Sequence, residues 1–252
     1  MLEVRNVTKR FGSLVAVRDI SMSVKAGELR AIIGPNGAGK TTFFNMISGY
    51  FAPTEGTIAF DGQDVTQIPA HIRVALGMGR TFQITEIFPE LTVHENVLTA
   101  AEVAAGQTLH MVPTRADAKR TEDVTAEMLA LVGLANKAER LVGELAHGDQ
   151  RVTEIAMSLA QRPRLLLLDE PTAGMGDQET YDITALIRRL HRDSKFTIVL
   201  IEHDMRVVFH LADYITVLDQ GNLLAEGTPK DIAASEAVQA AYLGDSKSKR
   251  SA

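Results

Sequence analysis

A glycine-rich stretch, GPNGAGKTT at Gly34–Thr42, constrains this chain more than any other feature. It fits G-x-x-x-x-G-K-[ST], with the apolar run LRAIIG before it and TTFFNMISGY after it, which predicts a buried strand, a tight loop and a helix. Glycines let backbone N–H groups surround phosphates, and a helix N-terminus adds partial positive charge. In this motif Lys40 reaches the β- and γ-phosphates and the Thr41 hydroxyl binds Mg²⁺. A glycine-rich turn with a chance lysine is the weaker interpretation, because both flanking elements fit.

A second acidic motif follows another buried strand. The run LLLLDEPT at Leu165–Thr172 is continuously apolar up to Asp169, as expected of a strand covered on both faces. Ligands bind at the carboxyl ends of strands in open α/β sheets, so Asp169 can hold Mg²⁺, directly or through water. Glu170 faces differently and can act on an attacking water. By itself the motif could equally be an acidic turn, but the upstream phosphate loop favours the functional interpretation.

Two further polar residues fall at predicted strand ends. Gln83 follows GMGRTF, and His203 follows TIVLIE. A lone glutamine or histidine at a strand end is more often structural. Because both recur beside the same expected site, we predict a functional role for each.

The order of elements predicts an α/β fold with a helical insertion. Short strand patterns fill the first third, helical patterns fill about 91–160, and strands alternate with helices afterwards. Thr92 and Glu95 predict a capping box at the start of the first inserted helix. The closing SKSKRSA reads as a polar, disordered tail.

Composition excludes several classes of function. The chain has no cysteine, which rules out disulfides and cysteine-based catalysis or metal sites. Its 32 acidic and 26 basic residues give a net charge of -6, so we expect no nucleic-acid partner. Leu165–Leu168 is as long as any aliphatic run in the chain, whereas a membrane-spanning helix needs roughly 20 apolar residues. No signal peptide is evident. If the chain acts at a membrane, we expect it to do so by binding a partner protein.

Five motifs in one order resemble the ABC transporter ATPases over about Leu2–Gly244. They are GPNGAGKTT, the glutamine of RTFQ, LAHGDQR, LLLLDEPTAG and the histidine of IEHD. The resemblance implies a P-loop NTPase, RecA-like core with an antiparallel β subdomain and an inserted helical subdomain. The core and β subdomain would occupy 1–90 and 161–244, the helical subdomain with the signature motif 91–160, and the polar tail 245–252.

The resemblance also assigns roles to residues. Phe11 matches the aromatic that stacks on adenine, Gln83 the glutamine that senses Mg²⁺ and the lytic water, Glu170 the acid that polarises that water, and His203 the γ-phosphate contact. The implied magnesium ligands are Thr41, Gln83 and Asp169. The residues implied to bind ATP are Phe11, Gly34, Asn36, Gly37, Ala38, Gly39, Lys40, Thr41, Thr42, Ala146, His147 and Gly148.

The segment LAHGDQ matches the ABC signature, usually LSGGQ, with three departures. Ala146 replaces the serine whose hydroxyl would meet the γ-phosphate, His147 replaces a glycine and Asp149 replaces a glutamine. Gly148 remains before a helix, so the helix N-terminus can still face phosphate. A carboxylate near triphosphate is repelled unless it points away or pairs with a cation such as Arg151. In the later loop TAGMGD, Gly176 stands where the family usually carries aspartate or asparagine.

Within the family the chain is similar to branched-chain (hydrophobic) amino acid uptake ATPases of the G type. Urea or amide uptake cassettes and the lipopolysaccharide-export cassette stay open as alternatives, as do a soluble non-transport ABC ATPase and a non-hydrolysing regulatory module. The implied partners are a second ATPase (homodimer or paralogous F-type), membrane permeases and, indirectly, a periplasmic binding protein. The implied location is the cytoplasmic face of the inner membrane. Phe88, Pro89 and Leu91 could contact the permease or be ordinary packing.

Overall fold

The structure is a computed structural model that describes residues 1–81, 87–106 and 114–248. The chain divides into two compact units. Unit 1 comprises Met1–Arg73 with Leu190–Ala252, and unit 2 comprises Val74–Arg189. The predicted boundaries of the helical subdomain, between residues 90 and 91 and between residues 160 and 161, stay a prediction.

Unit 1 begins with an antiparallel sheet in the order β2-β1-β4-β5. Its strands are β1 (Leu2–Phe11), β2 (Leu14–Val24), β4 (Glu55–Phe60) and β5 (Gln63–Asp64). Strand β2 is long because its whole length pairs with β1 across register shifts. Alternate residues of β1 and β2 are buried, which gives the sheet one apolar face.

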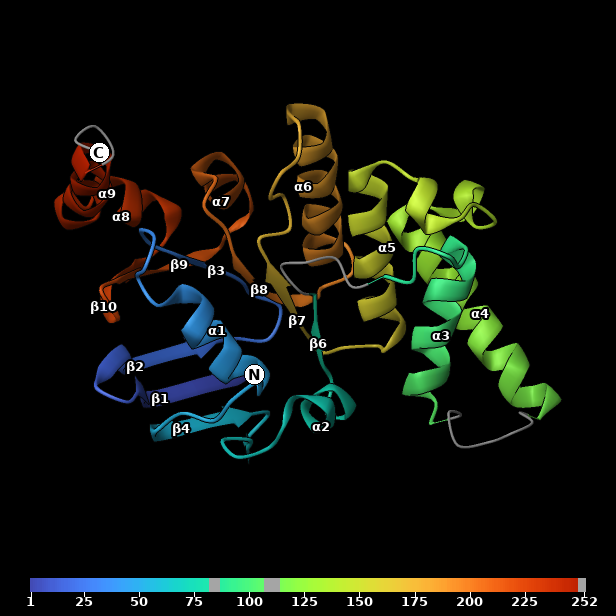
Figure 1. The fold of residues 1–252 in the computed structure, drawn as a ribbon, viewed down its shortest axis with the longest axis horizontal. Helices are drawn as coiled ribbons and strands as arrows, with labels where there is room; N and C mark the ends of the chain where they lie inside the picture. Colours follow the sequence, from blue (N-terminus) through green and yellow to red (C-terminus); the bar gives the residue numbers. More distant parts are fainter. Residues whose placement is uncertain (82–86, 107–113, 249–252) are drawn as a thin grey trace. The chain divides into compact units, whose positions relative to one another are not determined.

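The parallel strands of unit 1 belong to a second sheet. β3 (Leu29–Ile33) pairs in parallel with β8 (Thr197–Ile201) and β9 (Tyr214–Asp219), and β10 (Asn222–Gly227) closes the hairpin with β9. Every residue of β3 and β8 is buried, as expected of strands covered on both faces. Figure 1 shows α1 (Lys40–Ser48) running between these strands and the antiparallel sheet.

Further helices complete unit 1. They are α7 (Met205–Leu211), α8 (Pro229–Ala234) and α9 (Glu236–Ser248), while α2 (Ala70–Ala75) lies at the boundary between the units. The helix α9 reaches Ser248, so the prediction of a disordered tail is wrong for 246–248. The alanines and the leucine of AAYLG favour helix, and the helix continues through the polar residues after them.

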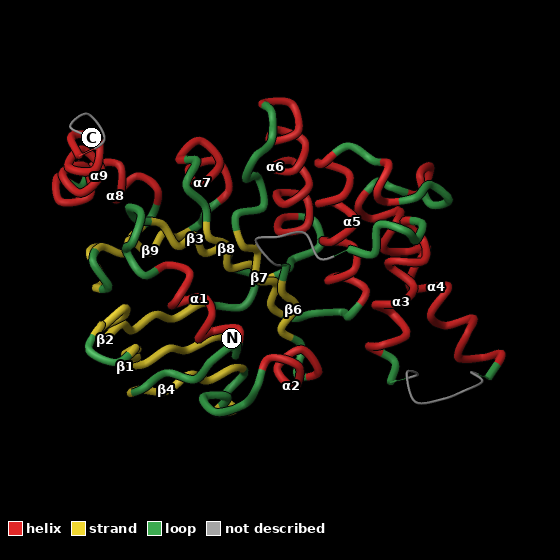
Figure 2. Tube along the Cα trace, in the orientation of Figure 1, coloured by secondary structure: helices red, strands yellow, loops and turns green. Residues whose placement is uncertain are grey.

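Unit 2 is mainly helical. Figure 2 shows α3 (Val93–Ala104), α4 (Arg115–Val132) and α5 (His147–Ala160) packed beside one another, as the insertion pattern predicted. Two 3₁₀ turns, η2 (Ala135–Lys137) and η3 (Val142–Glu144), connect α4 to α5. β6 (Met78–Arg80) pairs in parallel with β7 (Leu165–Asp169), and α6 (Asp177–Arg192) follows β7.

Helix starts show how local sequence sets the boundaries. The predicted capping box is confirmed: the Thr92 side chain accepts from Glu95 N, and the Glu95 side chain accepts from Thr92 N. α4 begins at Arg115, because Thr114 caps it by accepting from Asp117 N. Across the described ranges, no helix combines the length and apolarity that crossing a bilayer requires.

Candidate nucleotide-binding site

The glycine-rich loop lies in unit 1, between β3 and α1, in a conformation that needs glycine at two positions. Gly34 has φ 152° and Gly39 has φ 93°. A Cβ on Gly34 would lie 2.1 Å from Leu218 O, and one on Gly39 would lie 2.5 Å from Ala16 O. Any other residue would push the loop away from β9 or β2, so these glycines fix how closely the backbone can fold.

The N-terminus of α1 is prepared for an anion. Gly39 supplies no side-chain cap and the first turn holds no acid, so no carboxylate of that turn competes for its N–H groups. Lys40 is buried, and its Nζ donates to Gly34 O at 2.7 Å and to Pro35 O at 3.0 Å. The ammonium group is therefore held inside the loop's own curve.

The remaining predicted loop residues differ in exposure. Asn36, Gly37 and Thr41 are exposed, Thr42 is half-buried, and Ala38 is buried beneath the loop. Thr41, the predicted magnesium ligand of this loop, is therefore an exposed residue. Their roles in binding nucleotide stay predictions.

Two other predicted residues, Phe11 and His203, also belong to unit 1. Phe11 ends β1 with 48% of its surface exposed. His203 follows β8 with an exposed side chain, whereas the neighbouring Glu202 is completely buried. Glu202 Oε2 accepts from His203 N at 3.0 Å and Asp204 N at 3.4 Å. Glu202, which we did not predict, therefore fixes the turn that presents His203.

The acidic pair lies in unit 2, at the end of β7. Asp169 is 2% exposed, and its Oδ2 accepts from Arg80 Nη2 at 3.2 Å. Burial raises the pKa of the Asp169 carboxyl, and the nearby Arg80 guanidinium opposes that rise. Glu170 has φ 45°, a left-handed conformation that a non-glycine residue adopts at a cost in energy. The backbone therefore changes from extended strand to a left-handed turn directly after Asp169.

A buried arginine fixes this turn. Arg151 Nη2 donates to Asp169 O and, at 3.3 Å, to Glu170 O, while its Nη1 donates to Glu154 Oε2. Arg151 is 3% exposed and Glu154 is 4% exposed. A buried ion pair at an i,i+3 spacing on α5 therefore holds the carbonyl groups of the acidic motif.

The signature segment also lies in unit 2, where it begins α5. Ala146 and His147 are exposed and Gly148 is buried. Ala146 gives the helix no side-chain cap. Gly148 N instead donates to Glu179 Oε1 of α6 at 3.1 Å. Nothing in the sequence pattern drew attention to Glu179.

Asp149, the departure that raised the question of repulsion, has a cationic partner. Lys137 Nζ of η2 donates to Asp149 Oδ2 at 2.6 Å. The suggestion that Arg151 would be that cation is wrong. Arg151 donates its hydrogen bonds to Glu154 and to the carbonyl oxygens of Asp169 and Glu170. The Asp149 charge is thus balanced from outside its own helix.

One predicted residue cannot be placed: Gln83 lies outside the described residues. Unit 1 contains the phosphate loop, Phe11 and His203, and unit 2 contains the acidic pair and the signature helix, which Arg151 connects. Within the ranges that the structure describes, no three His, Asp or Glu side chains gather as a ready-made metal site. The described oxygen groups, Thr41 and Asp169, are of the kind that Mg²⁺ prefers.

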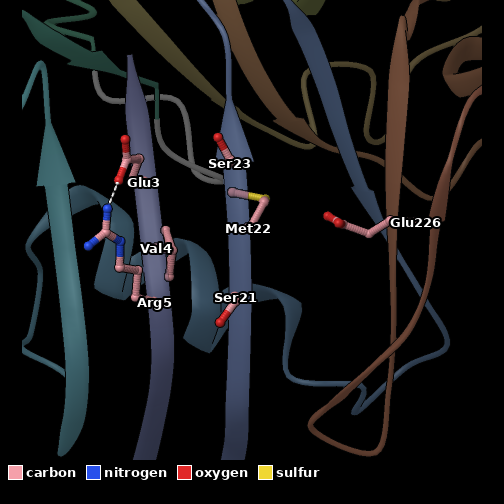
Figure 3. A pocket seen from close by; sticks show the side chains of 7 residues that line it. All are labelled: Glu3, Val4, Arg5, Ser21, Met22, Ser23 and Glu226. Carbon is pink, nitrogen blue, oxygen red and sulfur yellow. Dashed lines mark hydrogen bonds and ion pairs between the residues drawn. The ribbon is translucent and has the colours of Figure 1, made fainter.

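A shallow hollow on unit 1 lies apart from these residues. Its lining comprises Glu3, Val4, Arg5, Ser21, Met22, Ser23 and Glu226 (Figure 3). Its volume is ≈ 320 Å³. Its charges are already paired, since Arg5 donates to Glu3 and Arg30 donates to Glu226. It contains none of the predicted site residues, and its chemistry suggests no ligand.

Comparisons with known proteins identify the family of the chain. Residues 17–173 match the family described as ABC transporter, and residues 222–247 match the one described as branched-chain amino acid ATP-binding cassette transporter. The chain is 42% identical over 252 residues to the high-affinity branched-chain amino acid transport ATP-binding protein BraF of Pseudomonas aeruginosa, covering 97% of this chain and 98% of that protein. It is 40% identical over 250 residues to the corresponding protein LivG of Escherichia coli, covering 97% and 98%.

Solved structures share the fold. The dimeric, post-hydrolysis state of the ATP-binding cassette MJ0796, bound to ADP and Pi, superposes with a TM-score of 0.75 at 26% identity. The superposition covers 91% of this chain and 99% of that one. The predicted α/β P-loop NTPase fold is therefore confirmed.

Proposed function

This chain belongs to the ABC transporter family of ATP-binding proteins, and from that membership we propose that it hydrolyses ATP to power the uptake of branched-chain amino acids. The observation that carries the proposal is the glycine loop, whose backbone curves around Lys40 at the uncapped start of α1. The match at residues 222–247 favours branched-chain amino acids over urea, amides or lipopolysaccharide as cargo.

The phosphate loop would bind ATP with groups that already face its interior. Lys40 Nζ lies 2.7 Å from Gly34 O, so a small swing of the amine exchanges carbonyl oxygens for phosphate oxygens. The N–H groups at the start of α1 add partial positive charge. Phe11, half exposed at the end of β1, would stack on adenine.

Magnesium fits the oxygen donors that the family resemblance assigns. Thr41, Asp169 and Gln83 would hold Mg²⁺, which would neutralise charge on the β- and γ-phosphates. The Asp169 carboxylate is already orientated by Arg80, and Arg151 holds the carbonyl of the same residue. The acid would therefore keep its place whether or not the ion is bound.

Hydrolysis would depend on Glu170 and His203. Glu170 would accept a proton from the attacking water, from a left-handed turn of the backbone directly after Asp169. His203 would contact the γ-phosphate from a turn that buried Glu202 keeps in place. Gln83 would help to position the water.

The partners follow from the family. Two cassettes would bind ATP between the phosphate loop of one and the signature helix of the other, as a homodimer or with a paralogous F-type ATPase. That the MJ0796 cassette is dimeric supports association in pairs. Permease subunits would hold the dimer at the cytoplasmic face of the inner membrane, and a periplasmic binding protein would deliver cargo to them.

Phe88 is a candidate contact for the permease. Its ring is 51% exposed, while its backbone is fixed: Asn96 Oδ1 accepts from Phe88 N at 2.8 Å and Asn96 Nδ2 donates to Phe88 O at 3.0 Å. Pro89 is also exposed and Leu91 is half-buried. An exposed aromatic on a rigid backbone suits docking to an apolar groove.

The test of the proposed function uses Lys40→Ala. Losing the ammonium group removes a charge-assisted contact to phosphate, so we expect ATP affinity to fall at least about tenfold and phosphate release to be abolished. Lys25→Ala, which removes the same charge from an exposed turn, is the matched control and should behave as wild type. Unchanged ATP affinity and turnover in Lys40→Ala would refute the nucleotide site.

Cargo is tested separately by reconstitution. The chain, its permeases and its binding protein, placed in vesicles with ATP, should accumulate labelled leucine, isoleucine or valine and not urea. Urea uptake without branched-chain uptake would assign the other cargo while keeping the ATPase role.

A further inference from the structure

Glu179 connects the start of the signature helix to the loop that follows Glu170. Its Oε1 accepts from Gly148 N at 3.1 Å, and its Oε2 accepts from Gly176 N at 3.3 Å. A Cβ added to Gly148 would lie 3.2 Å from Glu179 Oε1 and 3.3 Å from its Cγ, so the side chain packs directly against that glycine. A carboxylate therefore fills the position in front of a helix N–H group that the family resemblance assigns to a phosphate.

The local sequence explains why an acid from another helix occupies this place. A serine at Ala146 could accept from the first turn of α5, but alanine cannot, and α5 has no side-chain cap. The acid within the turn itself, Asp149, is bound by Lys137. The partial positive charge of the helix start is left for Glu179, which the helix dipole favours.

We propose that Glu179 is a built-in competitor of the nucleotide: its carboxylate holds the Gly148 N–H until the triphosphate carried by a second cassette displaces it. The proposal rests on the proposed function, in which the signature helix meets ATP across a dimer. Both anions need the same donor, and two like charges at hydrogen-bond distance from one N–H group repel each other. The state bound to Glu179 and the state bound to phosphate are therefore mutually exclusive.

This competition would determine the nucleotide concentration that is needed to close the dimer. A contact that exists only in the separated cassette stabilises that state and opposes closure by the same free energy. Because the second oxygen of Glu179 holds Gly176, the displacement also reaches the loop between Glu170 and α6. Arrival of the partner's nucleotide would thus be transmitted to the loop that follows Glu170.

The test is Glu179→Gln, measured as dimer formation against the concentration of a non-hydrolysable ATP analogue with Mg²⁺, by sedimentation velocity. Glutamine keeps the length and one acceptor oxygen but loses the charge. Because hydrogen bonds to charged groups are stronger than neutral ones, we expect the half-saturating concentration to fall about fivefold. Glu144→Gln is the matched control, an exposed acid four residues before Gly148 with no contact to it among the described hydrogen bonds, and should leave the midpoint unchanged.

The outcomes separate this inference from the proposed function. An unchanged or higher midpoint in Glu179→Gln, or an equal fall in Glu144→Gln, overturns the competitor role. At protein concentrations too low for dimers to form, binding of the analogue depends on the phosphate loop alone. If the wild-type protein does not bind the analogue under these conditions, the proposed nucleotide site is refuted. If the analogue binds but neither wild type nor Glu179→Gln dimerises, the inference is wrong and the nucleotide site stands. Matching thermal unfolding of all three proteins excludes a folding defect.

Discussion

At the scale of single residues, Phe11 belongs to a small cluster with Phe51 and Lys9. Its ring lies 5.5 Å from that of Phe51 in an edge-on arrangement, and Lys9 Nζ lies 5.4 Å from the Phe11 ring and 4.6 Å from the Phe51 ring. Lys9 is itself held by Ala52 O at 2.6 Å. The cluster restricts the orientation of an exposed ring before any ligand arrives.

This arrangement predicts base-dependent binding. Phe11→Ala should weaken ATP binding by about 1–3 kcal/mol, the usual worth of one base–aromatic stack, and leave tripolyphosphate binding unchanged. Leu14→Ala, which truncates a 64%-exposed apolar side chain at the same hairpin, is the control. Calorimetric titration with both ligands checks the prediction, and equal losses for ATP and tripolyphosphate would contradict it.

Asp149 shows how a neighbour changes the meaning of a residue. A carboxylate in the first turn of α5 suits the helix dipole but would repel an approaching triphosphate. Lys137 lies 2.6 Å away and balances that charge. Its ammonium comes from η2, which precedes α5. The departure from the usual glutamine is therefore electrostatically compensated.

At the scale of elements, α1 is anchored at both ends. Its start follows the glycine loop, and its end is closed by Gly49, whose N–H bonds Asn45 O and Met46 O. Arg73 of α2 adds hydrogen bonds to Met46 O at 2.8 Å and Ile47 O at 2.6 Å. It also bonds the carbonyl groups of Val65, Thr66 and Ile68. One guanidinium thus joins the phosphate-loop helix to the segment after β5.

Arg73 should be essential for stability. It is 1% exposed, and although burial lowers its pKa to about 10, it stays charged at neutral pH. Arg73→Met keeps much of the volume but leaves several buried carbonyl groups unsatisfied, so we expect a loss of about 3–5 kcal/mol in the free energy of unfolding. Urea denaturation followed by circular dichroism measures it. Arg5→Ala, at an exposed ion pair, should change stability by less than about 0.5 kcal/mol; a similar effect of both variants would contradict this role.

At the scale of the whole molecule, the proposed site would need more than one copy of the chain. The phosphate loop and the signature helix belong to different units, and the proposed dimer pairs the loop of one copy with the helix of the other. ATP is then a ligand shared by two chains, so binding favours association and hydrolysis reverses it.

Glu170→Gln tests that cycle. The substitution keeps the groups that bind nucleotide and removes the acid that activates water, so we expect turnover to fall at least about 100-fold and an ATP-bound dimer to accumulate. Size-exclusion chromatography with bound-nucleotide analysis measures the dimer. Glu127→Gln, at an exposed ion pair with Arg162, should retain wild-type turnover. Wild-type-like turnover in Glu170→Gln would show that Glu170 does not activate the attacking water.

Sequence alone determined the features that depend on contiguous residues. The strand, glycine loop and helix of 29–48 follow from local backbone preferences, and so do the capping box at Thr92 and the buried strand that ends at Asp169. Each requires only hydrophobic periodicity, the conformational freedom of glycine or one side chain reaching its own turn. The family order of motifs then identified the fold and the nucleotide chemistry.

Only the tertiary structure decided which charges meet. Glu179 lies 31 residues from Gly148, Arg151 lies 18 from Asp169, and Lys137 lies 12 from Asp149. No local pattern predicts these pairs, because packing of separate elements brings the groups together. The sequence suggested Arg151 as one possible partner of Asp149, whereas in the folded chain Arg151 is buried against Glu154 and Lys137 binds Asp149.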